Sequence, residues 1–178
     1  MFVPFGIPVY FQGQRKFMFE GLDAIDWASL SHAYGSASDV PDLLRLLLSE
    51  DQQIREDALI ELFGNIHHQG TIYEASSYAI PFLVELMNCP AFSGKDDIAM
   101  LIICIAAGRG YYEVHATGER RKEWEEILAQ KNQSLDEAIH REAKYIRRLR
   151  EVASPYIPRL LSYLQHKDSE LRQQSRDI

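Results

Sequence analysis

The residues best suited to chemistry in this chain are its histidines, cysteines and carboxylates, and their spacing predicts no catalytic centre. No two of the six histidines stand four residues apart, the spacing that would place two zinc ligands on one helix face. Cys89 and Cys104 are the only cysteines, and their positions suit neither a disulfide framework nor a zinc site. The sequence also lacks the nucleophile elbow of hydrolases and the glycine-rich loops that bind phosphates or dinucleotides. We therefore expect no enzyme activity, no metal and no cofactor.

Large aromatic residues stand beside carboxylates between residues 108 and 133, which makes this segment the first candidate for binding. Tyrosine and tryptophan are enriched at the energetic centres of protein interfaces. The alternative is that these rings only cover the end of a hydrophobic core. The candidate binding residues of this segment are Tyr111, Tyr112, Glu119, Glu123, Trp124 and Glu126.

A second candidate group lies in and just after the segment Asn65-Ile-His-His-Gln-Gly70. His67 and His68 follow Gly64, which we expect to end a helix. They are candidate binding residues together with Tyr73. The alternative is that both histidines only satisfy turn carbonyls or solvent.

The overall charge indicates which partners suit the chain. It has 26 acidic and 19 basic residues and a net charge of −7. This charge opposes attraction to the phosphates of nucleic acid and favours association with a basic protein. One basic run stands out: Arg141, Lys144, Arg147, Arg148 and Arg150. Because Glu142 and Glu151 are interleaved with it, we interpret this run as a solvated or partner-facing helix rather than a nucleic-acid face.

No segment has the properties of a membrane span or a signal peptide. The first ten residues are apolar but lack a basic start, and Pro4 and Pro8 interrupt them. The longest later apolar run covers residues 98–107, which is too short to cross a bilayer. We expect a soluble, cytoplasmic protein whose cysteines are buried free thiols.

Three similar stretches of sequence determine the predicted fold. Residues 40–47, 80–87 and 157–164 each begin with a β-branched residue and a proline, followed by apolar residues at matching positions. The copies are offset by 40 and 77 residues, and a period near 40 is typical of HEAT and armadillo helix pairs. Asp51 and Arg55 recur as Asp168 and Arg172. We expect each Asp to stabilise a helix start and each Arg to bridge to the neighbouring repeat.

Apolar spacing and capping residues predict where the helices lie. Asp39 is expected to be an N-cap, and Pro81 is expected inside a helix that it kinks. The expected helices cover residues 23–32, 39–48, 51–64, 72–88, 96–107 and 135–152, and a final pair begins at 155. On the long helix 135–152, Glu142 falls on the same stripe as the apolar residues.

The Pro-x-apolar-apolar stretches with Asp-x-x-x-Arg resemble HEAT repeats over most of residues 25–178. Two segments carry a narrower resemblance, to a group of small bacterial HEAT-repeat proteins: Gly64-Asn-Ile-His-His-Gln-Gly-Thr-Ile-Tyr-Glu-Ala75 and Ala79-Ile-Pro-Phe-Leu-Val-Glu-Leu86. The resemblance implies a superhelix of helical hairpins, and some members of that group accompany secreted toxins as immunity proteins. The insertion at 108–133 departs from a regular array.

The predicted fold is an all-α, α-α superhelix of HEAT-like helical hairpins with a short irregular N-terminal cap. We expect one domain over 1–178, divided into the cap (1–22), the first helix pairs (23–107), the insertion (108–133) and the long helix with an incomplete last pair (134–178). The expected function is non-catalytic protein binding, in its sharpest form as an immunity protein that neutralises a basic toxin. The alternatives are a nucleic-acid-binding enzyme of the HEAT-like DNA glycosylase type and a regulatory scaffold module of a longer protein.

Overall fold

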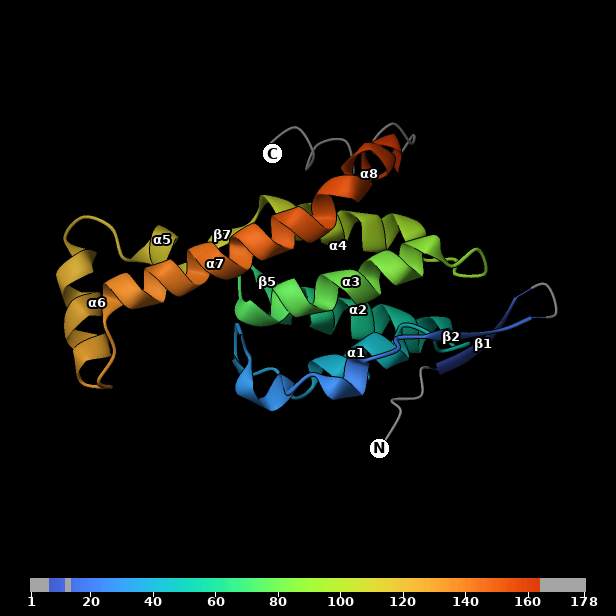
Figure 1. The fold of residues 1–178 in the computed structure, drawn as a ribbon, viewed down its shortest axis with the longest axis horizontal. Helices are drawn as coiled ribbons and strands as arrows, with labels where there is room; N and C mark the ends of the chain where they lie inside the picture. Colours follow the sequence, from blue (N-terminus) through green and yellow to red (C-terminus); the bar gives the residue numbers. More distant parts are fainter. Residues whose placement is uncertain (1–6, 12–13, 164–178) are drawn as a thin grey trace.

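The computed structural model describes residues 7–11 and 14–163, which form a mainly α-helical chain with a few small strands (Figure 1). The helices are α1 (Val40–Leu46), α2 (Gln52–Ile66), α3 (Glu74–Asn88), α4 (Lys95–Ala107), α5 (Tyr111–His115), α6 (Arg120–Ala129), α7 (Leu135–Ala153) and α8 (Ile157–Tyr163). The predicted helices 39–48, 51–64, 72–88, 96–107 and 135–152 agree with α1, α2, α3, α4 and α7 to within two residues at each end. The mainly α fold is thus confirmed.

Helix α3 is at the centre of the packing. Helices α1 and α2 pack against each other, and so do α3 and α4, while α3 also contacts α1 on one side and α7 on the other. Figure 1 accordingly shows α1, α3 and α7 following one another across the molecule. Helix α8 packs mainly against α4, and Arg159 of α8 hydrogen-bonds to Asn88 at the end of α3.

The third copy of the sequence repeat does not occupy the place that a regular array gives it. The first two copies lie in α1 and α3, which pack against each other, whereas residues 157–163 form α8, which packs mainly against α4. On the side of α3 opposite α1, the neighbouring helix is α7, which contains no copy of the Pro-x-apolar-apolar stretch. Asp168 and Arg172 lie outside the described residues.

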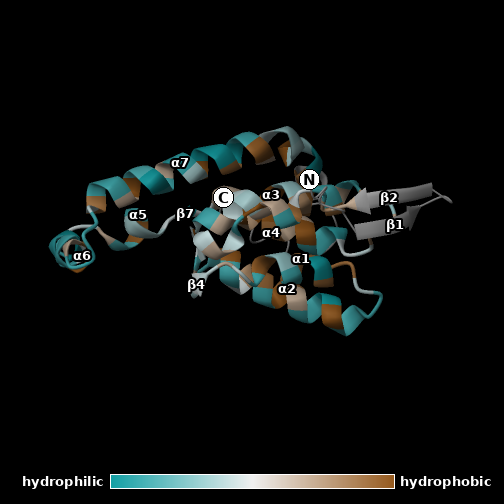
Figure 2. Cartoon of the chain, turned by 60° about the horizontal axis from the view of Figure 1, so that its bottom comes forward, coloured by the Kyte–Doolittle hydropathy of each residue, from teal (hydrophilic) through white to brown (hydrophobic). Residues whose placement is uncertain are grey.

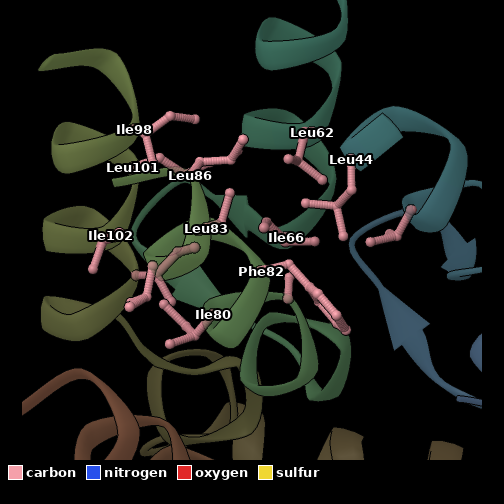
Figure 3. Close-up of a cluster of buried hydrophobic side chains, with 14 of the residues drawn as sticks. Leu44, Leu62, Ile66, Ile80, Phe82, Leu83, Leu86, Ile98, Leu101 and Ile102 are labelled. Carbon is pink, nitrogen blue, oxygen red and sulfur yellow. The ribbon is translucent and has the colours of Figure 1, made fainter. Parts of the chain in front are cut away.

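The hydrophobic core forms where apolar residues at helical spacing meet between α1, α2, α3 and α4 (Figure 3). Leu83 and Leu86 of α3 are fully buried among side chains of three other helices. The side chains around them come from α1 (Leu44), α2 (Leu62 and Ile66) and α4 (Ile98, Leu101 and Ile102). Helix α3 continues through Pro81, whose exposed position keeps its ring out of this core.

The N-terminal region differs from the prediction. The short cap expected to be irregular contains regular structure among its described residues, because β1 (Ile7–Phe11) and β2 (Gln14–Met18) form an antiparallel pair. The expected helix 23–32 is wrong: the chain forms two short 3-10 turns, Leu22–Ala24 and Trp27–Ser29, and then the paired strands β3 (Ser31–His32) and β4 (Gly35–Ser36). Trp27 anchors this segment, because its indole N–H donates to the Leu22 carbonyl (2.9 Å) and its ring packs on Phe82.

Asp39 links this segment to the end of α2 and does not cap α1 with its side chain. Its carboxylate accepts from His32 Nε2 at 3.0 Å and from Asn65 Nδ2 at 2.7 Å. His32 Nδ1 accepts from the Tyr34 N–H, so the neutral ring carries its proton on Nε2 and donates it to Asp39. The predicted N-cap is therefore used for a tertiary contact.

Two further local predictions need correction. Gly64 does not end α2: the helix includes Gly64 and continues to Ile66. Asp51 does cap α2, since its carboxylate accepts from the Gln53 and Ile54 N–H groups. Arg55, however, donates to the carbonyls of Ser49 and Glu50 and so closes its own α1–α2 turn instead of bridging to another helix pair.

Candidate functional site

A three-stranded sheet of two-residue strands joins the start of α3 to the end of α4. Strand β6 (Thr71–Ile72) pairs antiparallel with β5 (His67–His68) and parallel with β7 (Arg109–Gly110). Gln69 and Gly70 both have positive φ, at 50° and 82°, as tight hairpin turns require. Gly108 allows the close approach of β7, since a Cβ there would lie 2.3 Å from Ile72 Cγ2. The sheet thus places the residues after α4 beside Tyr73.

The buried carboxylate of Glu142 fixes the start of α5. Its oxygens accept from the N–H of Tyr112 at 2.9 and 3.1 Å and from the N–H of Glu113 at 3.2 Å. Gly110 is required here, because a Cβ at this position would lie 2.4 Å from Glu142 Oε2. These contacts satisfy backbone donors that a helix start otherwise leaves without partners.

Burial makes Glu142 electrostatically unusual. The side chain is 5% exposed, and loss of solvent raises its pKa, although the N–H groups of Tyr112 and Glu113 oppose the shift. Tyr145, one turn further along α7, donates to the Ile72 carbonyl at 3.3 Å. The pKa of Tyr145 is also raised, first by burial and then by the negative charge of Glu142. Both groups hold the α5 segment and β6 against α7.

Five rings from three parts of the chain meet at this junction. We call Tyr73, Tyr111, Tyr112, His115 and Trp124 the aromatic cluster. Tyr111 is at its centre, with ring centroids 6.4 Å from Tyr73, 4.5 Å from His115 and 5.6 Å from Trp124. Tyr112 also lies 5.4 Å from Trp124. All five rings are partly exposed, so they both pack together and present a surface.

Helices α5 and α6 form an arm, residues 111–133, that rests on the N-terminal half of α7 (Figure 1). The arm has its own small hydrophobic cluster, separate from the core between α1 and α4. Its buried members are Ala116, Leu128, Leu135 and Ala138. Tyr112 and Trp124 pack against this cluster, so the expected interface residues also cover a core. These two rings therefore cover a core, as the alternative expected, and their role in an interface stays a prediction.

The predicted acidic residues lie on the exposed surface of the arm. Glu119 immediately precedes α6, while Glu123 and Glu126 follow at helical spacing, which places the three on one side. Arg121 pairs elsewhere, with Glu125 at 2.9 Å and with Asp136 at 2.6 Å. Within the described part of the chain, Glu119, Glu123 and Glu126 form no ion pair. They make an acidic stripe next to Trp124.

His67 and His68 lie beside the aromatic cluster but do not join it. The His68 ring is 5.4 Å from the exposed Tyr34, whose hydroxyl is 3.3 Å from His68 Nδ1. His67 packs edge-on against Phe63 at 5.2 Å, and burial lowers its pKa. The Thr71 hydroxyl connects the two groups. It donates a hydrogen bond to the His68 carbonyl at 2.7 Å and accepts one from the Tyr73 hydroxyl at 3.0 Å.

Two adjoining clefts open along α3 and α7. The first, about 370 Å³, is bounded by Tyr73, Tyr111, Tyr112, Glu142 and Tyr145 among others. The second, about 400 Å³, shares Glu74, Arg141 and Tyr145 with the first. We call the second cleft the α3–α7 groove; its walls are Glu74, Ser77 and Tyr78 from α3 and Arg141, Lys144, Tyr145, Arg147, Arg148 and Glu151 from α7. All members of the predicted basic run except Arg150 thus lie on one wall of this groove.

The site contains residues that the sequence prediction did not select. Glu142 and Tyr145 position the arm, and Arg141 lines both clefts. A signal for Glu142 was present, because a carboxylate on an otherwise apolar stripe of a helix must have buried partners. Tyr34 lies near His68 in a segment that Asp39 and the Ala33 N–H tie to Asn65 of α2, and local sequence does not reveal these contacts.

Comparisons of the chain with protein-family models, with curated proteins and with solved structures find no match. Among residues 7–11 and 14–163, no helix combines the length and apolar character needed to cross a membrane. The same residues contain no group of three or more His, Cys, Asp or Glu side chains placed to hold a metal ion.

Proposed function

We propose that this chain is a protein-binding module whose partner contacts the aromatic cluster and the acidic stripe of the arm. The observation that carries the proposal is the meeting of Tyr73, Tyr111 and Trp124, from three separate segments, beside an open cleft. Rigid, partly exposed rings supply much contact area with little loss of conformational entropy, as is typical of interface centres.

The finer form of the proposal is a superhelical HEAT-like protein that neutralises a toxin. Its support is the resemblance of residues 64–86 to small bacterial HEAT-repeat proteins and the acidic stripe of Glu119, Glu123 and Glu126. Exposed carboxylates attract a basic partner over a distance and speed its association, while aromatic contacts slow its release. An inhibitor of a basic toxin needs both properties.

The partner is to be identified by affinity capture from the native cell with mass spectrometry, together with inspection of the neighbouring gene. Affinity for the purified partner is then compared between the wild type and the variants Tyr111→Ala and Trp124→Ala. Each substitution is expected to weaken binding at least about tenfold, mainly through faster release. Ile60→Ala is the matched control, because Ile60 is a 72% exposed apolar residue on α2, outside the proposed face.

The acidic stripe has a separate test. Glu123→Gln with Glu126→Gln is expected to slow association and to reduce its dependence on salt, with a smaller effect on release. Unchanged affinity in the Tyr111, Trp124 and stripe variants would place the interface elsewhere. A partner with an acidic contact surface would contradict the toxin form of the proposal and leave protein binding in place.

A further inference from the structure

The α3–α7 groove concentrates cations that have no internal partners. Arg141, Lys144 and Arg147 are exposed on α7, and within the described residues none of them has a carboxylate at ion-pair distance. Some other surface arginines are neutralised: Arg45 pairs with Asp42, and Arg109 pairs with Glu113 at 3.0 Å. In a chain whose net charge is −7, this gathering of unpaired cations in one groove stands out.

Aromatic groups complete the groove. The Arg148 guanidinium lies over the Tyr78 ring, with Cζ 4.4 Å from the ring centroid, and this cation–π contact holds the Arg148 side chain at the groove. A stacked arginine keeps its N–H edge free to donate to an anion. Tyr145 also lines the groove and donates to the Ile72 carbonyl, so this ring is positioned by a contact already made within the chain.

The length of the cationic wall limits the ligand. From Arg141 to Arg148 a helix advances about 10 Å, the length of about three residues of extended peptide. Glu74 and Glu151 also line the groove. These carboxylates and the negative net charge oppose a long polyanion such as nucleic acid, whereas a short anionic segment can place its charges against the cations alone.

We propose that the α3–α7 groove binds a short, extended, acidic segment of a partner protein, with carboxylates paired to Arg141, Lys144 and Arg147. This inference rests on the proposed protein-binding function and adds a second contact of opposite charge to that of the arm. Clusters of arginine and lysine are a recurring means of recognising acidic motifs. A partner would therefore present basic residues to the acidic stripe and carboxylates to the groove.

The test uses the full chain and a labelled ten-residue peptide that carries four glutamates, with binding followed by fluorescence anisotropy. The double variant Lys144→Glu with Arg147→Glu is expected to weaken binding at least about tenfold. Lys122→Glu with Lys131→Glu is the matched control, because it makes the same charge change at exposed positions outside the groove. This control is expected to change affinity less than about twofold, and the same peptide with four glutamines is expected not to bind.

Three results would overturn the inference. The first is that the glutamate peptide shows no saturable binding. The second is that the groove variant and the control variant lose affinity equally. The third is that a ten-nucleotide single-stranded DNA binds more tightly than the peptide and that the groove variant abolishes this binding. The last result would assign the groove to nucleic acid. Because the peptide assay does not involve the captured partner, failure here leaves the test of Tyr111 and Trp124 unaffected.

Discussion

The main core and the arm are two hydrophobic regions joined by the same long helix, and they are held together differently. The main core, between α1, α2, α3, α4 and the second half of α7, consists of many fully buried apolar side chains. The cluster under the arm has four buried residues, Ala116 and Leu128 in the arm and Leu135 and Ala138 on α7, and the arm relies on Glu142 and Gly110 for its attachment. Figure 2 shows the contrast: α6 and α7 are mostly hydrophilic, whereas brown is more frequent on the helices beneath them.

This contrast places the candidate interface on the less stable region. Regions with few buried apolar contacts open at lower free energy than the global fold. Trp27 lies in the main core and Trp124 in the arm, so the two indole N–H signals in an NMR spectrum report on one region each. Following both signals during urea unfolding compares the regions within one molecule.

The largest effect is expected from Leu83→Ala in the main core. Leu83 is 0% exposed, and its truncation should lower the free energy of unfolding by about 2–5 kcal/mol. Both indole signals should then be lost at a lower urea concentration, since the arm rests on a helix that the core supports. Leu46→Ala is the control, because Leu46 of α1 is 43% exposed. Equal losses in the two variants would show that burial around α3 does not dominate stability.

A smaller and local effect is expected from Gly110→Ala. The added Cβ would overlap the Glu142 carboxylate and displace α5, lowering the stability of the arm by about 1–3 kcal/mol. The Trp124 signal should respond at lower urea than the Trp27 signal. Gly64→Ala is the opposite control: a Cβ there meets nothing within 4 Å inside α2, so stability should rise by up to about 1 kcal/mol. Loss of both signals together in Gly110→Ala would mean that the two regions unfold as one.

The pH dependence of the arm is the third comparison. The pKa of Glu142 is raised in the folded state, so the folded arm binds this proton more readily than the unfolded chain does. Glu142 should therefore make the arm less stable as pH rises from its unfolded pKa, near 4.5, through its folded pKa. Urea unfolding followed by the Trp124 signal between about pH 4 and about pH 8 measures this trend. Glu142→Gln should flatten it, and an unchanged slope would assign the dependence to other groups.

The smallest effect is expected from Arg121→Ala. Arg121 pairs with Glu125 and Asp136 on the surface of the arm, and exposed ion pairs contribute little to stability. The Trp124 signal should therefore disappear at the same urea concentration as in the wild type. A loss comparable to that of Gly110→Ala would show that surface pairs, and not Glu142, hold the arm.

The sequence predicted the main core better than the arm, because the main core follows from local apolar spacing whereas the arm depends on contacts between distant residues. Apolar residues at helical spacing locate α3, α4 and α7, and the burial of Leu83, Leu101 and Leu149 follows from it. The segment 23–32 failed because Trp27 and Asp39 are used for contacts with α3 and α2, which local capping patterns do not contain. The superhelix and its binding function remain predictions.

The candidate site was predicted in part. Tyr73, Tyr111, Tyr112 and Trp124 were selected as aromatic residues, and the structure brings them together. Their meeting depends on the β6–β7 pair, whose two strands are separated by the whole of α3 and α4. A contact between residues so distant in sequence leaves no periodic pattern. Glu142 is different, because its place on an apolar stripe indicates a buried carboxylate that needs polar partners.

The parallel pairing of Thr71 with Arg109 also means that the α3–α4 hairpin begins and ends at the same place. Residues 89–94 form the loop at its other end, and we expect added residues there to leave the spacing of the rings unchanged, because the β6–β7 pair sets that spacing. One residue added between Ala107 and Tyr111 would move the N–H groups of Tyr112 and Glu113 off Glu142 and separate Tyr111 from Tyr73. Variation in length is therefore tolerated at one end of this hairpin and excluded at the other.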